Sequence, residues 1–384
     1  MGLKRLWNTL TGSTGHQLTP QASNPGDTNT LWADSNSNNE LQLGAGPASG
    51  ITRVTSGALT LNVATTGNNS TGDGSPGSPF ATVPGALAYL DTRYAMGGEA
   101  LVTIQLADGT YTVTTPEIWM SSQGLRVSIV GNTGTPANVN LITANNMAGS
   151  DMITVKGRLA SIAGIKFESV SHLTLSNVQL LIMGPNAEVD LISDCEFDLG
   201  AGNGSGYCIN GPDHCSVAIT TTSFVVNSGN GALRLDRNSS LETITGVTIT
   251  LANNSFGIRM EYGCDARLSG LTITTTSTSA TGVFLGYGCT AYLIGVNITG
   301  NDNSTTGLET FGLCHIYVWF CVFQELGEGV HAEHGSQVHL TGHVTLSNQW
   351  GTGNLSNTNI ALSTSAGATP DFSEYGAVIY QYAP

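Results

Sequence analysis

The segment Gly257-Ile-Arg-Met-Glu-Tyr-Gly-Cys264 returns three times along the chain, as Gly282-Val-Phe-Leu-Gly-Tyr-Gly-Cys289, Gly307-Leu-Glu-Thr-Phe-Gly-Leu-Cys314 and Gly329-Val-His-Ala-Glu-His-Gly-Ser336. The leading glycines are 25, 25 and 22 residues apart. Each copy runs into a short stretch of alternating apolar and polar residues, such as Ala291-Tyr-Leu-Ile294. A fixed period of this size is typical of stacked units that bury a core only against their neighbours. Since each unit consists of short strands, the repeat predicts a parallel β-solenoid.

The composition agrees with extended strands joined by glycine turns. Of 384 residues, 49 are glycine and only 10% are charged, which is unlike a helical enzyme or a disordered polyelectrolyte. The formal net charge is −15 with only 12 Lys and Arg, so we expect no nucleic-acid partner. The sequence holds no Walker loop, Gly-x-Ser-x-Gly or His-Glu-x-x-His motif, and we expect neither a cofactor nor a metal.

The first 50 residues differ from the rest, being rich in Asn, Ser, Thr and Gly without a sustained apolar period. Within them, residues 30–46 are typical of a hairpin, two strands around an Asn/Ser turn. The basic start lacks the apolar core of about 7–15 residues found in secretory signals. No segment approaches the roughly 18 consecutive apolar residues of a membrane span. We interpret residues 1–50 as an anchor that docks onto another protein.

A helix is predicted directly after the glycine-rich loop that ends near residue 80. Thr82 is a candidate N-cap and Pro84 lies in the first turn. The helix has one apolar stripe, made of Val83, Ala86, Leu87 and Leu90. Because the end coil of a solenoid exposes an apolar cross-section, this stripe is suited to cover it. We therefore divide the chain into an N-terminal anchor (1–50), a linker strand and capping helix (51–100), a solenoid (101–345) and a C-terminal cap or tail (346–384).

Two stretches carry a resemblance to a known class of proteins. The run Leu31-Trp-Ala-Asp34 with Leu41-Gln-Leu-Gly44 resembles the small hairpin at the head of many phage tail proteins. The second stretch passes from Pro79-Phe-Ala-Thr82 and the helix through Leu106-Ala-Asp-Gly-Thr-Tyr111 to Ile129-Val-Gly131. It resembles the first part of the right-handed parallel β-helix in phage tailspikes and pectin-lyase-like proteins. The resemblance covers about residues 60–345 and is more specific for fold than for activity.

The resemblance implies an all-β, right-handed parallel β-helix that forms homotrimers on the virion. It implies a tailspike or tail fibre that binds bacterial surface polysaccharide during host attachment. One subtype cleaves the polysaccharide as a glycoside hydrolase-like depolymerase, and another only binds it. Residues 1–50 would dock to phage tail or baseplate proteins. Two alternatives stay open: a secreted polysaccharide lyase, and an adhesin or structural solenoid without ligand chemistry.

The strand alternation assigns side chains to the outer surface of the solenoid. After each leading glycine the outward positions form two columns: Arg234, Arg259, Phe284, Glu309 and His331, and beside them Asp236, Glu261, Gly286, Phe311 and Glu333. Asp236 and Glu261 should lie about 5 Å apart at the backbone, close to the carboxyl separation of a retaining glycosidase. Glu309, about 10 Å from Glu261, suits an inverting one. These three are the candidate catalytic residues.

Their neighbours are candidates for binding substrate. Arg234 and Arg259 could orient a hydroxyl or an acidic substituent, and Phe284 or Phe311 could stack on a sugar ring. Two other interpretations stay open. The carboxylates and arginines could be solvated surface ion pairs of little energetic value, or they could contact sugar without doing chemistry.

A second outward face is aromatic. Its columns hold Arg267, Tyr292, Tyr317 and His339, and beside them Ser269, Ile294, Trp319 and Thr341. Exposed rings in such a patch indicate a contact surface. A carbohydrate platform and a subunit interface both fit, because Tyr and Trp are enriched at interfaces. We favour Tyr292, Tyr317 and Trp319 as a subunit interface.

Three of the seven cysteines, Cys264, Cys289 and Cys314, occupy the same position in successive repeats. Stacking would place them in one column, roughly 4.8 Å apart. A disulfide or metal ladder is one interpretation of the column. We favour small buried thiols that serine can replace, since Ser336 holds the position in the next repeat.

Overall fold

The computed structural model describes residues 57–341 and 344–347, apart from gaps at 98–99, 145–146, 148–150, 171–177, 201–205, 228–229, 253–254 and 277–278. It also describes the backbone of strands 30–34, 40–44, 52–54, 360–361 and 378–381. The chain divides into two compact units, 1–59 with 88–101, and 60–87 with 102–384. Among the described residues, no helix has the length and apolarity needed to cross a membrane.

The first unit contains the predicted hairpin. Strands β1 (Thr30–Asp34) and β2 (Glu40–Gly44) pair antiparallel, with Thr30 opposite Gly44. Strand β3 (Thr52–Val54) pairs in parallel with β5 (Tyr94–Met96). The rest of residues 1–50 lies outside the described residues, so the proposed anchor stays a prediction.

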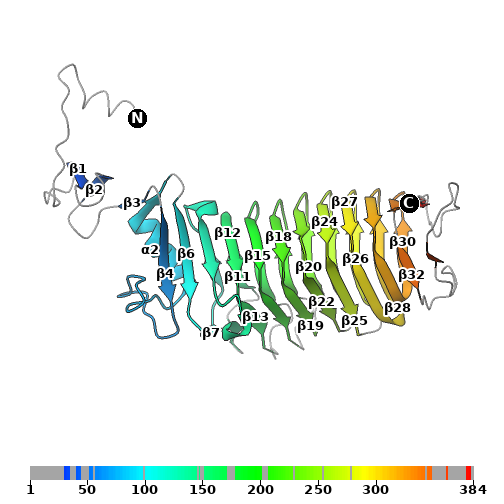
Figure 1. Ribbon diagram of the computed structural model, residues 1–384, viewed down its shortest axis with the longest axis horizontal. Helices are drawn as coiled ribbons and strands as arrows, with labels where there is room; N and C mark the ends of the chain where they lie inside the picture. Colours follow the sequence, from blue (N-terminus) through cyan, green and yellow to red (C-terminus); the bar gives the residue numbers. More distant parts are fainter. Residues whose placement is uncertain are drawn as a thin grey trace, which may run out of the picture. The chain divides into compact units, whose positions relative to one another are not determined.

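The second unit is a β-solenoid, in which each coil from β6 onward to β30 contributes one strand to each of three faces (Figure 1). Face 1 contains β8 (Glu117–Trp119), β11 (Asp151–Val155), β14 (Gln179–Met183), β17 (Tyr207–Gly211), β20 (Gly231–Asp236), β23 (Phe256–Glu261), β26 (Thr281–Gly286) and the later parts of β28 (Asn297–Phe311) and β30 (Val322–Glu333). Face 2 contains β4 (Ala58–Val63), β6 (Leu101–Leu106), β9 (Val127–Val130), β12 (Arg158–Ala163), β15 (Glu188–Ser193), β18 (Ser216–Thr220), β21 (Ser240–Thr243), β24 (Asp265–Ser269), β27 (Thr290–Ile294), β29 (His315–Trp319), β31 (Gln337–Thr341) and β34 (Val378–Gln381). Face 3 contains β7 (Gly109–Val113), β10 (Val139–Thr143), β13 (Lys166–Ser169), β16 (Glu196–Leu199), β19 (Ser223–Val226), β22 (Val247–Leu251), β25 (Leu271–Thr275), the first parts of β28 and β30, β32 (Thr345–Ser347) and β33 (Ile360–Ala361).

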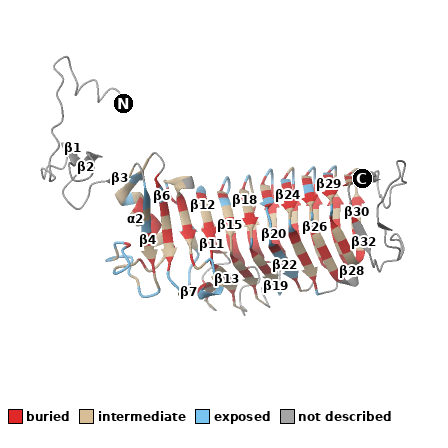
Figure 2. Ribbon diagram, viewed as in Figure 1, coloured by how far each residue is buried: buried red, intermediate tan, exposed pale blue. Residues whose placement is uncertain are grey.

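Strands of successive coils pair in parallel within each face, which confirms the predicted solenoid. Along β20 and β23 the partners are Leu233 with Ile258 and Leu235 with Met260, all buried, as the alternation predicts. Figure 2 shows the resulting pattern, with buried positions alternating with intermediate and exposed ones along the strands. The exception to parallel pairing is β33, which runs antiparallel to β32. β34 adds a strand from the predicted C-terminal cap to face 2 by pairing with β31.

The repeated glycines are required by the close approach of neighbouring coils. A Cβ on Gly257 would lie 2.4 Å from the carbonyl oxygen of Gly282. A Cβ on Gly282 would lie 2.7 Å from that of Gly307, and one on Gly307 would lie 2.5 Å from that of Gly329. Because real Cβ atoms do not approach backbone oxygens this closely, the coils that contain Gly257, Gly282 and Gly307 need glycine here for the next coil to stack. One coil earlier, Ala232 holds the corresponding position. The repeat that identifies the fold is therefore also a packing constraint.

The helix α2 (Val83–Arg93) begins where the sequence predicts. The Thr82 Oγ1 accepts a hydrogen bond from the Gly85 N–H at 3.2 Å, which is the expected N-cap interaction. All four residues of its predicted apolar stripe are buried: Val83, Ala86, Leu87 and Leu90. Val83 lines a small cavity together with Val113 and Leu141 of the first coils. The first turn of α2 thus lies against the start of the solenoid.

Two short 3-10 helices, η1 (Gly124–Arg126) and η2 (Pro136–Asn138), interrupt the first coils.

The cysteine column lies inside the turn between faces 1 and 2. Cys264, Cys289 and Cys314 are fully buried, and all seven cysteines of the chain are free thiols. Ser336 holds the same position one coil later, where its Oγ accepts a hydrogen bond from the Cys314 N–H. These positions confirm the interpretation of small buried packing residues.

We expect that none of the seven thiols reacts with Ellman's reagent in the native protein, and that all seven react in denaturant. Burial raises the pKa of Cys195 to about 12. The Cys289 thiol lowers the pKa of Cys314 to about 7, but Cys314 is fully covered, so access rather than ionisation blocks the reaction. The number of thiols titrated with and without denaturant checks this. Rapid native reaction of even one thiol would contradict the burial described here.

Candidate functional site

Face 1 places the predicted catalytic and binding residues in the predicted columns. Asp236 pairs with Glu261 across β20 and β23, and the column continues through Gly286 to Phe311. The neighbouring column runs through Arg234, Arg259, Phe284 and Glu309. The register deduced from the alternation is therefore confirmed at every one of these positions.

The carboxylates of Asp236 and Glu261 are buried and paired with arginines, instead of being open to solvent. The Arg234 Nη2 lies 2.7 Å from the Asp236 Oδ2, and the Arg259 Nε lies 2.9 Å from the Glu261 Oε2. Asp236 is only 6% exposed and Glu261 only 5%. The Arg259 guanidinium lies over the Phe284 ring at 5.5 Å, so the binding candidates cover the catalytic ones. Burial raises the pKa of Asp236 in spite of its arginine partner.

The third predicted carboxylate is also engaged. The Thr281 Oγ1 donates to the Glu309 Oε2 at 3.3 Å, and burial raises the pKa of Glu309. Phe311 packs on the His334 ring with 4.2 Å between centroids. Face 1 is thus a network of covered ion pairs and rings. This network gives a substrate little access to the carboxylates of Asp236 and Glu261.

The same network contains a histidine whose ionisation should be visible in stability. The two ring nitrogens of His331 lie 2.5 Å from a Glu328 oxygen and 2.8 Å from a Glu333 oxygen, which raises the pKa of His331 to about 9. A raised histidine pKa contributes stability that is complete below about pH 6.5 and is lost as the pH rises through 9.

We therefore expect His331→Gln to destabilise the protein by on the order of 1–2 kcal/mol at pH 6, allowing for solvent screening of a partly exposed group. The difference between the two proteins should vanish by about pH 10. Urea denaturation of both proteins across this range measures it. A difference that stays constant with pH would show that the contacts of His331 do not depend on its charge.

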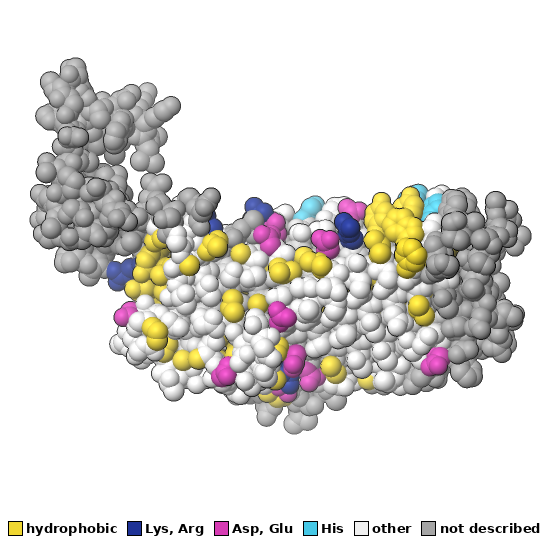
Figure 3. Space-filling view, viewed as in Figure 1, with side chains coloured by type: hydrophobic (Ala, Val, Ile, Leu, Met, Phe, Trp, Pro, Cys, Tyr) yellow, Lys and Arg dark blue, Asp and Glu magenta, His cyan; other side chains and the backbone are white. Residues whose placement is uncertain are grey.

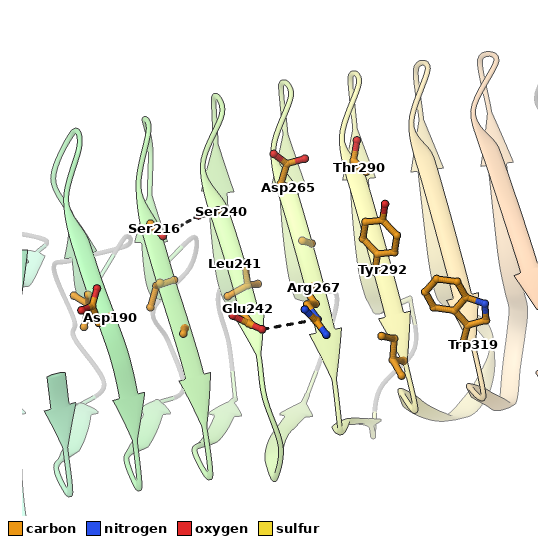
Figure 4. A pocket seen from close by; sticks show the side chains of 15 residues that line it. Asp190, Ser216, Ser240, Leu241, Glu242, Asp265, Arg267, Thr290, Tyr292 and Trp319 are labelled. Atoms are coloured by element: carbon orange, nitrogen blue, oxygen red, sulfur yellow. Dashed lines mark hydrogen bonds and ion pairs between the residues drawn. The ribbon is translucent and has the colours of Figure 1, made fainter. Parts of the chain in front are cut away.

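Face 2 carries a groove of about 710 Å³ that crosses the strands from β15 to β29 (Figure 4). Fifteen residues line it: Val189, Asp190, Ser216, Val217, Ala218, Ser240, Leu241, Glu242, Asp265, Ala266, Arg267, Thr290, Tyr292, Ile294 and Trp319. These residues come from six successive coils. The groove therefore follows the stacking direction, and its shape suits an extended ligand rather than a compact one.

Aromatic rings form one end of the groove. Tyr292 stacks on Tyr317 with 5.1 Å between centroids and 10° between planes, and Tyr317 stacks in the same way on His339 at 4.9 Å. Trp319 lies 5.9 Å from the Tyr292 ring. Tyr292 is 39% exposed, so this ladder presents rings to solvent. Figure 3 shows a hydrophobic cluster over the β27–β31 end of the solenoid, with acidic and basic side chains beside it.

Polar groups form the other end. The Ser240 Oγ donates to the Ser216 Oγ at 2.8 Å, and the Arg267 Nε lies 3.9 Å from the Glu242 Oε1. Figure 4 shows Asp190 on the neighbouring coil beyond Ser216. Desolvation is the larger cause that raises the pKa of Asp190, and the hydrogen bond and negative charge of the nearby Glu188 raise it further. The groove thus has hydroxyl and carboxylate oxygens at one end and aromatic rings at the other.

Sequence reasoning found only part of this groove. It placed Arg267 and Tyr292 in one column, and the register confirms that column and extends it back to Glu242 and Ala218. Beyond Ala218 a bulge between Val189 and Ile192 interrupts the pairing, and Asp190 lies within it. The alternation of residues 240–243 could have revealed Glu242, because it continues the column one coil before the clear repeats.

No family model, no curated protein and no solved structure matches this chain. Within the described part of the chain, no group of three or more His, Cys, Asp or Glu side chains is placed to hold a metal ion. The geometry of the two faces is therefore the basis for a functional proposal.

Proposed function

We propose that this chain is a phage tailspike or tail-fibre protein that binds bacterial surface polysaccharide along the groove of face 2 during host attachment. The observation that carries the proposal is the aromatic ladder of Tyr292, Tyr317 and Trp319, which continues into hydroxyl and carboxylate groups. A sugar ring has apolar C–H faces and a rim of hydroxyls. It therefore needs flat apolar surfaces and hydrogen-bonding oxygens side by side.

This proposal assigns the three rings to glycan binding, whereas their sequence pattern alone favoured a subunit interface. The reason is continuity: Tyr292 and Trp319 line the same groove as Glu242 and Arg267. The groove also extends over six coils, which suits a polymer.

The assignment to a phage tail is supported by the resemblance of residues 31–44 to phage tail proteins. It is also supported by the resemblance of about residues 60–345 to the β-helix of phage tailspikes and pectin-lyase-like proteins. The antiparallel pairing of β1 and β2 is consistent with the first of these resemblances. In this proposal residues 1–50 attach the protein to the tail, and the chain acts on the virion as a homotrimer.

Cleavage of the bound glycan is a second candidate function, favoured by the carboxylates of the groove itself. Asp190 and Glu242 are both exposed and lie on either side of Ala218, two strand spacings or roughly 10 Å apart at the backbone. Inverting glycosidases separate their two carboxyl groups by about 6.5–9.5 Å. The raised pKa of Asp190 suits a general acid. Asp236 and Glu261 are covered, so we place any hydrolysis at Asp190 and Glu242.

One experiment tests binding and cleavage together. The purified protein is incubated with bacterial surface polysaccharides, and binding and new reducing ends are measured on the same samples. Binding to at least one polysaccharide is expected, and binding to none would overturn the proposed function. If reducing ends appear, Asp190→Asn and Glu242→Gln should abolish them, whereas Asp236→Asn should leave them; the reverse result would return catalysis to face 1.

A further inference from the structure

We infer that the groove of face 2 selects neutral polysaccharides, built of sugars without carboxylate, sulfate or phosphate groups. The inference rests on the proposed function and narrows its substrate class. It follows from the charges that line the groove and from the contacts that those charges make.

The groove is acidic along its polar end. Its lining includes the carboxylates of Asp190, Glu242 and Asp265, and Arg267 is the one basic side chain among the described lining residues. These carboxylates lie on the coils of β15, β21 and β24, so an extended ligand meets them in succession. An anionic sugar placed there would have a like charge close by at each step.

The single guanidinium does not offset this. The Arg267 Nε lies 3.9 Å from the Glu242 Oε1, so an anionic ligand would have to compete with that carboxylate. Farther along face 2, the Arg158 Nε pairs with the Glu188 Oε2 at 2.5 Å. The nearby cations of this face are therefore already matched by carboxylates, in a chain whose formal net charge is −15.

The same groups suit an uncharged sugar chain. Carboxylates accept hydrogen bonds from hydroxyls, and the Ser216, Ser240 and Thr290 hydroxyls can donate as well as accept. Tyr292 and Trp319 offer ring faces to the C–H side of a pyranose. A neutral ligand can use both ends of the groove at once, whereas an acidic ligand is opposed by the polar end.

The test compares matched glycans that differ only in charge. Alginate, hyaluronan and polysialic acid are each compared with their carboxyl-reduced forms, alongside neutral bacterial O-antigen polysaccharides, by affinity electrophoresis. We expect retardation by neutral glycans, at least tenfold tighter binding to the reduced member of any acidic pair that binds, and little change with salt. The Asp265→Asn variant should improve binding to acidic members about threefold or more, whereas Asp213→Asn, outside the groove, should not.

The outcomes separate the inference from the proposed function. Tightest binding to an acidic glycan, lost on carboxyl reduction and weakened by salt, would overturn the inference while glycan binding stands. Binding to no polysaccharide of either charge would overturn the proposed function itself. Neutral binding that Trp319→Ala does not weaken would move the neutral site away from this groove and so overturn the inference as stated.

Discussion

Trp319→Ala is expected to weaken polysaccharide binding about 30-fold or more without changing the melting temperature appreciably. Trp319 stacks against both Tyr292 and Tyr317, at 5.9 and 6.1 Å between centroids, and therefore holds the ladder together as well as offering its own face. Aromatic residues that dominate a binding site contribute about 2 kcal/mol or more, and about 1.4 kcal/mol corresponds to a tenfold change in affinity. Trp319→Phe should restore part of the affinity, because it keeps a flat ring.

The matched control for this experiment is Tyr262→Ala. Tyr262 is 50% exposed and stacks on Tyr287 at 4.9 Å, but it lies in the turn between faces 1 and 2 and does not line the groove. The Tyr262→Ala substitution removes a similar exposed ring from a similar ladder, and we expect it to change the affinity for polysaccharide less than threefold. Equal losses in the two variants would show that the ligand lies along the turn rather than in the groove. Isothermal titration calorimetry on all three variants measures the affinities.

Gly282→Ala is expected to destabilise the solenoid by about 2–3 kcal/mol, the upper part of the range for overpacking a close-packed site. The new Cβ would lie 2.7 Å from the Gly307 carbonyl oxygen and 2.9 Å from two carbon atoms of Ile298. The backbone oxygen belongs to the next coil, so relief requires moving one coil against another. Urea denaturation followed by circular dichroism measures the loss of stability.

Gly77→Ala is the control for the glycine column, because nothing lies within 4 Å of a Cβ at that position and its backbone does not need glycine. We expect it to be neutral within about 0.5 kcal/mol, as is usual for surface substitutions. If Gly282→Ala were equally neutral, the close approach of the coils at this column would not exist, and the explanation of the repeat given above would be wrong.

Much of the fold follows from residues that are neighbours along the chain. The period of the glycines predicts stacking, and the alternation within each strand predicts which side chains point outward. The glycine period and the strand alternation can both be recognised in the sequence, because strand alternation has a period of two and each coil contacts the next one at the same position. For that reason the sequence alone predicts that Asp236 shares a column with Glu261 and that Arg267 shares one with Tyr292.

The sequence does not predict in the same way whether the side chains of those columns are exposed to solvent. Whether Asp236 is open or covered depends on where Arg234 and its neighbours place their long side chains. Alternation assigns a side chain to a face, but the cover over it comes from lateral packing of flexible groups on adjacent coils. Alternation therefore predicted the register of the face 1 carboxylates correctly, but it did not show that their arginine neighbours cover them.

The sequence by itself determined that this chain is a stack of β-coils and which column each outward residue of the clear repeats joins. It also determined that charged side chains gather on one face and aromatic ones on another. Only the tertiary structure decided which face is open and that Asp190 and Glu242 line the same groove as Tyr292 and Trp319. The physical reason is that coil length varies. Asp190, Ala218, Glu242 and Arg267 are 28, 24 and 25 residues apart, with a bulge at the first of them, so no fixed period connects the acidic end of the groove to the aromatic one.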